Sequence, residues 1–279
     1  LSGLTRGLAS ENQSIKIINT PNSENCLVGI GFGLMINEVS SIFFMKQLDF
    51  LLLGIDQIVN TYNIVRQSTH KSSFTIFPVT MDSGYEGPQA SLNNLDDFCS
   101  IAGIEGYSIT NDIDAKEIIS NQLIKPGFRI ISVGQRLLQS DTLKLECLYR
   151  DVDNSFFKYK QGDDATIVCF NNALDYGVKL HSIMNSKGIK ASLFSVNSHL
   201  YKDYSLIIGD MKKSRNLILI DDTKSRNSVS DQFYIEALDA CELKNKVIIK
   251  RPITNDMFYP REDLLDIDYK KIVNDISHN

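Results

Sequence analysis

The stretch Ala165-Thr-Ile-Val-Cys-Phe-Asn-Asn-Ala-Leu-Asp-Tyr-Gly-Val-Lys-Leu-His-Ser-Ile-Met-Asn-Ser-Lys-Gly-Ile-Lys-Ala-Ser-Leu-Phe-Ser-Val196 decides the fold class. Short apolar, β-branched runs at 165–170 and 191–196 flank a helical stretch over 175–187. Parallel strands joined by a crossover helix have this pattern. The same alternation continues in both directions along the chain, which indicates an α/β protein.

The remaining elements follow from the same pattern. In the first half we expect strands at Lys16–Asn19, Ser41–Met45, Phe74–Val79, Gly106–Ile109 and Arg129–Val133, with helices at Glu24–Met35, Phe50–Arg66, Asn94–Ala102 and Asp112–Asn121. In the second half we expect strands at Ala165–Phe170, Ala191–Val196, Asn216–Ile220 and Lys246–Lys250, with helices at Asp175–Lys187, Asp203–Lys212 and Asp231–Leu238.

The segment Gln135–Gly162 divides these two halves. It is polar, lacks sustained helical periodicity and resembles a connector that carries one or two short strands. We therefore predict two domains, each a mostly parallel sheet flanked by helices. Residues 1–160 form the first domain with its connector, and residues 161–279 form a second, smaller domain.

Composition excludes several classes of function. The net charge of −5 is spread over 279 residues without a basic stripe, so nucleic acid is not an expected partner. The most apolar stretch, Phe43–Val59, is interrupted by Lys46, Asp49 and Asp56, and it cannot supply the roughly 20 apolar residues of a membrane span. We expect no membrane association and see no signal peptide.

Cysteine usage indicates a reducing compartment. The chain has five cysteines, far apart and without a Cys-x-x-Cys pair. The four histidines are equally scattered, at 70, 181, 199 and 278, without the spacing of a metal site or a catalytic triad. We expect reduced thiols, a cytoplasmic protein and no metal site built from this chain alone.

Glu24 is the first candidate for chemistry. It lies where Asn22-Ser23 opens a predicted helix directly after a predicted strand. A carboxylate at a helix start also has a purely local explanation, because it favours the helix dipole. Local sequence alone leaves both interpretations open.

The glycines at 29, 31 and 33 form a Gly-x-Gly-x-Gly pattern within the same predicted helix. In a dinucleotide-binding fold such glycines directly follow the strand and open the helix, whereas these lie several residues inside it. Close packing against another helix, including one from a second chain, explains them better.

Two further groups have a functional and a structural interpretation. Phe43, Phe44 and Phe50 could line a cofactor, although α/β folds bury aromatic side chains routinely. Polar residues at 221, 222, 224 and 226 (Asp, Asp, Lys and Arg) follow a predicted strand, at the edge where open sheets place ligands. A solvated charged loop accounts for this second group equally well.

Two blocks together resemble a known family. Ile17-Ile-Asn-Thr-Pro-Asn-Ser-Glu-Asn-Cys-Leu-Val-Gly-Ile-Gly and Phe44-Met-Lys-Gln-Leu-Asp-Phe-Leu-Leu-Leu-Gly-Ile-Asp-Gln-Ile-Val-Asn are similar, also in their separation, to the beta subunit of the first component of pyruvate dehydrogenase. The second half of the chain resembles the transketolase C-terminal domain. The resemblance covers essentially the whole chain and is strong over residues 15–60.

The family uses thiamine diphosphate, and the resemblance assigns two roles. Glu24 matches the glutamate that bonds the ring nitrogen of the aminopyrimidine and so activates the cofactor, and Phe50 matches the aromatic residue that stacks on the same ring. A carboxyl with this role needs a desolvated pocket. The implied activity is that of a 2-oxo acid dehydrogenase or transketolase-type subunit.

The chain departs from the family pattern in two places. The family has a histidine in the loop after the third strand, where Met81-Asp-Ser-Gly-Tyr-Glu-Gly-Pro-Gln-Ala-Ser-Leu-Asn-Asn has none. Ala90, Ser91 or Asn93 takes that position, depending on the placement of a gap. The family's opening helix and first strand also have no counterpart before Leu1, so the resemblance implies a chain shortened at its N-terminus.

The resemblance also implies a partner. The family holds the cofactor diphosphate through magnesium with a Gly-Asp-Gly motif, and Gly209-Asp210-Met211 and Gly162-Asp163-Asp164 both lack the second glycine. We therefore expect an alpha-type subunit to supply that motif and magnesium, in a heterotetramer. Two alternatives remain open: the C-terminal subunit of a split transketolase acting on sugars, and a degenerate, non-catalytic scaffold subunit.

Overall fold

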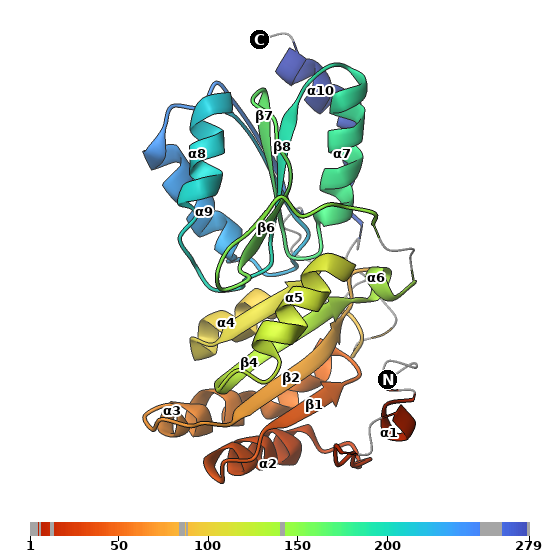
Figure 1. The fold of residues 1–279 in the computed structure, drawn as a ribbon, viewed down its shortest axis with the longest axis vertical. Coiled ribbons are helices and arrows are strands. Elements are labelled where there is room, and N and C mark those ends of the chain that lie inside the picture. Colours follow the sequence, from red (N-terminus) through yellow and green to blue (C-terminus); the bar gives the residue numbers. More distant parts are fainter. Residues whose placement is uncertain are drawn as a thin grey trace.

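The computed structural model describes residues 5, 7–11, 14–83, 87, 89–139, 143–251 and 264–277. They form two α/β domains stacked along the long axis of the molecule, each built on its own sheet (Figure 1). This confirms the predicted fold class. Within these residues no helix combines the length and the apolar content needed to cross a bilayer.

The N-terminal domain has a four-stranded parallel sheet in the order β1-β2-β4-β3. Its strands are β1 (Ser41–Met45), β2 (Ser73–Thr80), β3 (Glu105–Ile109) and β4 (Gly127–Gly134). Its helices are α1 (Leu8–Glu11), α2 (Glu24–Ile36), the 3₁₀ helix η1 (Leu48–Gly54), the π-helical turn η2 (Gln57–Thr61), α3 (Tyr62–Val65), α4 (Leu95–Ala102), α5 (Asp112–Gln122) and α6 (Gln135–Gln139).

Alternation along the strands sends side chains to both faces of this sheet. Phe74, Ile76, Phe128 and Ile130 pack under α2, η1, η2, α3 and α4. On the other face, Thr75 and Arg129 hydrogen-bond to main-chain carbonyls in and after α5, at Leu123 and Gln122.

The C-terminal domain has a six-stranded sheet in the order β10-β9-β7-β8-β6-β5. Its strands are β5 (Tyr149–Arg150), β6 (Phe156–Lys160), β7 (Ala165–Phe170), β8 (Ala191–Val196), β9 (Asn216–Asp221) and β10 (Asn245–Ile249). β7 to β10 are parallel, while β6 runs antiparallel to β8 and β5 antiparallel to β6. β5 and β6 come from the segment that we expected to be a connector; the boundary near residue 160 stays a prediction.

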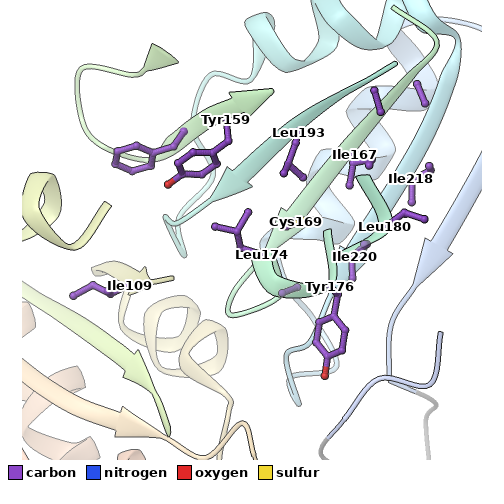
Figure 2. Packing of buried hydrophobic residues seen from close by; sticks show 14 of the residues in the cluster. Ile109, Tyr159, Ile167, Cys169, Leu174, Tyr176, Leu180, Leu193, Ile218 and Ile220 are labelled. Atoms are coloured by element: carbon purple, nitrogen blue, oxygen red, sulfur yellow. The ribbon is translucent and has the colours of Figure 1, made fainter. Parts of the chain in front are cut away.

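Helices cover both faces of the second sheet. They are α7 (Leu174–Ser186), α8 (Ser205–Ser214), α9 (Val229–Ala240) and α10 (Tyr269–Ser277). α7 and α10 pack on one face, and α8 and α9 on the other (Figure 1). Figure 2 shows how Leu174 and Leu180 of α7 meet Ile167, Leu193 and Ile218 of the strands.

The apolar core is continuous between the domains. One cluster joins Ile109 and Val133 of the first sheet with Phe157 and Tyr159 of β6 and with the α7 face of the second sheet. Because this cluster is shared, the carboxyl ends of β3 and β4 are held against the C-terminal domain.

Two expected elements differ from the structure. The strand predicted at Lys16–Asn19 is wrong: this segment is exposed, and no strand of the described residues pairs with it. The helix predicted over Phe50–Arg66 is present as one unbroken helical stretch over residues 48–65, but its geometry changes along the chain from 3₁₀ in η1 to π in η2 and α in α3.

Candidate functional site

Glu24 is the first residue of α2 and lies half-buried at the end of the helix nearest η1. The two helices approach closely at Gly54, where an added Cβ would lie 2.8 Å from Val28 Cγ2 and 3.7 Å from the carbonyl oxygen of Glu24. Ser23 precedes the helix and makes no side-chain capping bond. Within the described residues, the Glu24 carboxylate has no hydrogen-bond or ion-pair partner, so its acceptors are available to a ligand.

Phe50 lies in η1, the element that packs on α2 beside Glu24. Its half-buried ring is at the edge of the apolar cluster of the N-terminal domain. Phe43 is also at the edge of that cluster, whereas Phe44 packs against Phe77 with 5.5 Å between ring centroids. The structure therefore brings the elements that carry Glu24 and Phe50 together, while Phe44 is partly buried against the cluster shared by the two domains.

The three spaced glycines of α2 have different surroundings. A Cβ at Gly31 would lie 2.2 Å from the ring of Phe74, so the close approach here is to strand β2 of the same domain and not to another helix. At Gly29 an added Cβ would lie 3.5 Å from the Gln57 side chain, and at Gly33 it would meet nothing within 4 Å. The helix-packing explanation is wrong for Gly31, and the Gly33 side of the helix is open in this chain.

Exposed aliphatic side chains occur on the elements that carry Glu24 and Phe50 and on the segment before them, and we call this set the apolar surface. Three lie on the segment that leads into α2, two on α2 and two on η1. These are Ile15 (61% exposed), Ile17 (47%), Ile18 (64%), Ile30 (55%), Leu34 (37%), Leu52 (56%) and Leu53 (61%). A large exposed apolar surface commonly marks a protein interface.

The segment after β2, which carries a histidine in the family, is fixed at both ends. Asp49 of η1 accepts hydrogen bonds from the main-chain nitrogens of Ser91 (2.9 Å) and Leu92 (3.1 Å). Ala90 is buried, and Asn93 donates to the carbonyl oxygen of Asp222 at 3.0 Å. None of the three candidate positions offers a free side-chain nitrogen base; residues 84–86 and 88 lie outside the described residues.

Arg136 forms a partly buried charged centre between the domains. Its guanidinium lies 3.0 Å from Asp222, 3.4 Å from Asp82 and 3.6 Å from Asp175, and it donates to the hydroxyl of Tyr176 at 2.6 Å. Burial raises the pKa of Asp222 to about 7, although the Arg136 charge opposes the rise. With three carboxylates around it, Arg136 joins the domains and has little capacity left for a substrate.

The polar group after β9 is also part of this interface. Asp221, Asp222 and Lys224 are buried, and Arg226 is exposed. Asp221 accepts hydrogen bonds from Asn171 at 2.7 Å and from Ser230 at 2.5 Å. The solvated-loop interpretation is therefore wrong for the first three residues, because the N-terminal domain covers this edge of the sheet.

A buried line of hydrogen bonds has the residue order of a catalytic triad. His199 Nε2 lies 2.7 Å from Ser108 Oγ, and His199 Nδ1 lies 2.9 Å from Asp96 Oδ1. The residues His199, Ser108 and Asp96 are 4%, 1% and 3% exposed, respectively, and they come from both domains. A nucleophile needs access to its substrate, so we interpret this line as part of the domain interface. Asp96, Ser108 and His199 are too far apart in the sequence for their spacing to predict these hydrogen bonds.

Asp114 is another buried carboxylate at the interface, and its role is structural. It forms a capping box with Asn111 at the start of α5 and accepts a hydrogen bond from Asn197 of the C-terminal domain at 2.8 Å. Burial raises its pKa to about 6, against the lowering effect of these hydrogen bonds.

Neither Gly-Asp segment forms a metal site in the described residues. Asp210 lies in α8, is buried and pairs with Lys158 at 2.5 Å. Asp164 accepts a hydrogen bond from the main-chain nitrogen of Lys190 at 2.7 Å. No group of three or more His, Cys, Asp or Glu side chains with metal-binding geometry occurs in the described part of the chain.

Comparison with curated proteins finds similarity to pyruvate dehydrogenase beta subunits. The chain is 21% identical over 238 residues to "Pyruvate dehydrogenase E1 component subunit beta" of Rhizobium meliloti, covering 82% of this chain and 51% of the relative. It is 19% identical over 249 residues to the mitochondrial subunit of Pisum sativum, covering 85% and 68%. The chain thus spans about half the length of the first relative. No protein-family model matches it.

Solved structures with the same fold include transketolases. A structure described as "Split gene transketolase, inactive beta4 tetramer" superposes with a TM-score of 0.71 and 13% identity, covering 100% of this chain and 88% of that chain. A transketolase from Campylobacter jejuni superposes with a TM-score of 0.56 and 12% identity, covering 91% and 36%. These findings confirm the resemblance seen in the sequence: the chain is similar to pyruvate dehydrogenase beta subunits over most of its length and has a transketolase-type fold.

Proposed function

We propose that this chain is a beta-type subunit of a thiamine-diphosphate-dependent enzyme of the 2-oxo acid dehydrogenase or transketolase kind. The observation that carries the proposal is the arrangement of Glu24 and Phe50. A half-buried carboxylate without a protein partner in the described residues lies at the start of α2, on the helix that packs against the element carrying Phe50. The resemblance assigns these two residues to the aminopyrimidine of the cofactor.

The residues present fit that half of the cofactor. An aminopyrimidine ring has apolar faces and a polar edge, and it needs an apolar side chain beside it and an acid at its ring nitrogen. Phe50, at the edge of the apolar cluster, supplies the first, and Glu24 supplies the second. The cofactor, when bound, stabilises the carbanion formed by cleavage of a bond beside a carbonyl.

The residues of this chain hold and activate the pyrimidine. The Glu24 carboxyl would share a proton with the ring nitrogen, and Phe50 would fix the plane of the ring. A partner that covers the apolar surface would exclude water from Glu24 and so strengthen this hydrogen bond.

An alpha-type subunit is the partner that we propose. The sequence lacks a Gly-Asp-Gly motif, and Asp210 of one incomplete motif is taken up by its bond with Lys158. The diphosphate and its magnesium ion would therefore be held by the other chain. The apolar surface, which includes Ile18, Leu34 and Leu53, offers that chain exposed apolar side chains on the elements that carry Glu24 and Phe50 and on the segment before them. A heterotetramer with two shared sites and a cytoplasmic location remain predictions.

The segment after β2 bears on the choice of substrate. Ala90 is buried, and Ser91 and Asn93 are held by hydrogen bonds to Asp49 and Asp222. A reaction that needs a histidine from this segment must obtain the base elsewhere. Turnover of ketose phosphates without a lipoyl acceptor would favour the split-transketolase alternative, and a complex that binds no cofactor would favour the scaffold alternative.

The test is Glu24→Gln in the chain assembled with its alpha-type partner. We expect assembly to persist and turnover to be lost, because an amide cannot share the proton. Glu38→Gln, an exposed change just beyond the other end of α2, is the matched control and should keep full activity. Substantial activity in Glu24→Gln would contradict the proposed role.

A further inference from the structure

Lys224 reaches from the C-terminal domain into the N-terminal domain. Its ammonium donates to the carbonyl oxygens of Ser91 at 2.7 Å and of Met81 at 3.1 Å. Its main-chain nitrogen donates to the carbonyl oxygen of Asn93 at 2.8 Å. The side chain is 8% exposed. Lys224 therefore contacts both ends of the segment that follows β2.

Gln47 and η1 also hold the same two ends. Gln47, directly before η1, donates to the sulfur of Met81 at 3.6 Å. Asp49 accepts hydrogen bonds from the main-chain nitrogen and the hydroxyl of Ser91. The two ends also bond each other, because the main-chain nitrogen of Met81 donates to the carbonyl oxygen of Leu92 at 2.9 Å.

These contacts form a continuous chain of hydrogen bonds that ends next to Phe50. Lys224 fixes the carbonyl of Ser91, the nitrogen of Ser91 binds Asp49, and Asp49 precedes Phe50 in η1. Hydrogen bonds to a charged group in a buried site are stronger than those between neutral groups, so the contacts of the Lys224 ammonium are the strongest in this series of hydrogen bonds.

We propose that Lys224 is a positioning residue: it fixes the base of the segment after β2 and, through Ser91 and Asp49, the orientation of η1 and of Phe50. Through Lys224, the C-terminal domain thereby fixes the part of the N-terminal domain that carries Phe50 before cofactor or partner binds. The link to cofactor binding rests on the proposed function, whereas the mechanical link can be measured in the isolated chain.

The first test is hydrogen exchange of the isolated chain carrying Lys224→Met. Loss of a charged donor should speed exchange at the amides of Ser91 and Leu92 and in residues 48–54 by about tenfold, with unchanged exchange in β7 and β8. A lysine that served only overall stability would instead speed exchange throughout both domains. Unchanged rates at Ser91 and Leu92, or a uniform rise, would overturn the proposal.

Lys250→Met is the matched control. Lys250 is a partly buried lysine of the C-terminal domain, but its partners Ser228, Asp231 and Asp221 lie in its own domain. Its loss should leave exchange at Ser91 and Leu92 unchanged. If Lys224→Met does not fold, Lys224→Gln keeps an uncharged donor and should show a smaller acceleration at the same amides.

The second test measures cofactor affinity in the complex with the alpha-type partner. Lys224→Met should weaken binding of thiamine diphosphate with magnesium by about tenfold, since a ring contact that is not held in place contributes less to affinity. Faster exchange with unchanged affinity would overturn the link to Phe50. Absence of binding to the wild-type complex would instead refute the proposed function, and the exchange result would still decide the role of Lys224.

Discussion

Replacement of Arg136 by methionine should be among the most damaging single changes in this chain. The guanidinium lies between Asp82, Asp175 and Asp222, and it also donates to the carbonyl oxygen of Asn172 at 2.9 Å. Asp222 is fully buried, and Asp82 is 1% exposed. Methionine fills much of the same volume but leaves both carboxylates without their cation.

The expected cost is about 3–5 kcal/mol of unfolding free energy at about pH 8, the range for breaking a buried ion pair on one side. The cost should shrink at about pH 5. Burial already raises the pKa of Asp222 to about 7, and loss of Arg136 removes the interaction that opposes this rise. A group with a raised pKa in the folded state contributes its stability at low pH and loses it as the pH rises through the folded-state value.

Urea unfolding followed by tyrosine fluorescence measures this cost, since the chain has no tryptophan. Arg150→Met is the control. Arg150 also joins the domains, through Glu117, but its side chain is 43% exposed, and exposed pairs contribute about 1 kcal/mol or less. The reasoning is refuted if Arg136→Met costs no more than the control, or if its cost is the same at both pH values.

Three further predictions concern the core and the site. Gly31→Ala should cost about 1–3 kcal/mol in a thermal melt, because its Cβ would overlap the ring of Phe74, whereas Gly33→Ala should be neutral or stabilising. Asp114→Asn should lower the stability of the fold, because it removes a carboxylate that accepts several hydrogen bonds, and it should flatten the pH dependence of stability. Burial raises the pKa of Asp114 to about 6, so the stability that this group contributes in the wild type is lost between about pH 4 and 6. Unfolding measured at several pH values would reveal both effects. Phe50→Ala should weaken cofactor binding in the assembled enzyme by about tenfold while subunit assembly persists in gel filtration.

The strands could be predicted because their apolar runs are continuous. The bounds of β1, β7 and β8 are those expected, since runs such as Ala165–Phe170 are buried on both faces of a parallel sheet. The residues expected to form a helix over Phe50–Arg66 are helical up to Val65, but the 3₁₀ geometry of η1, which comes close to Val28 of α2 at Gly54, was not expected. The periodicity of apolar residues along one helix carries no information on how closely that helix approaches a second one.

The candidate site could be predicted only in part. Glu24 and Phe50 belong to short motifs that can be read within one block of sequence. The contacts of Lys224, Arg136 and His199 could not be read, because each joins residues of different domains that are far apart along the chain. Their charges indicated solvent exposure, and only the closure of one domain on the other places them inside.

Calorimetric titration of thiamine diphosphate with magnesium tests the central claim most directly. It should be done with this chain alone and with the chain assembled with its alpha-type partner. The proposed shared site predicts binding to the complex and none to the isolated chain, with binding to the complex lost or greatly weakened in Glu24→Gln. Tight binding to the isolated chain would contradict the shared site, and no binding in either sample would contradict a cofactor-dependent function.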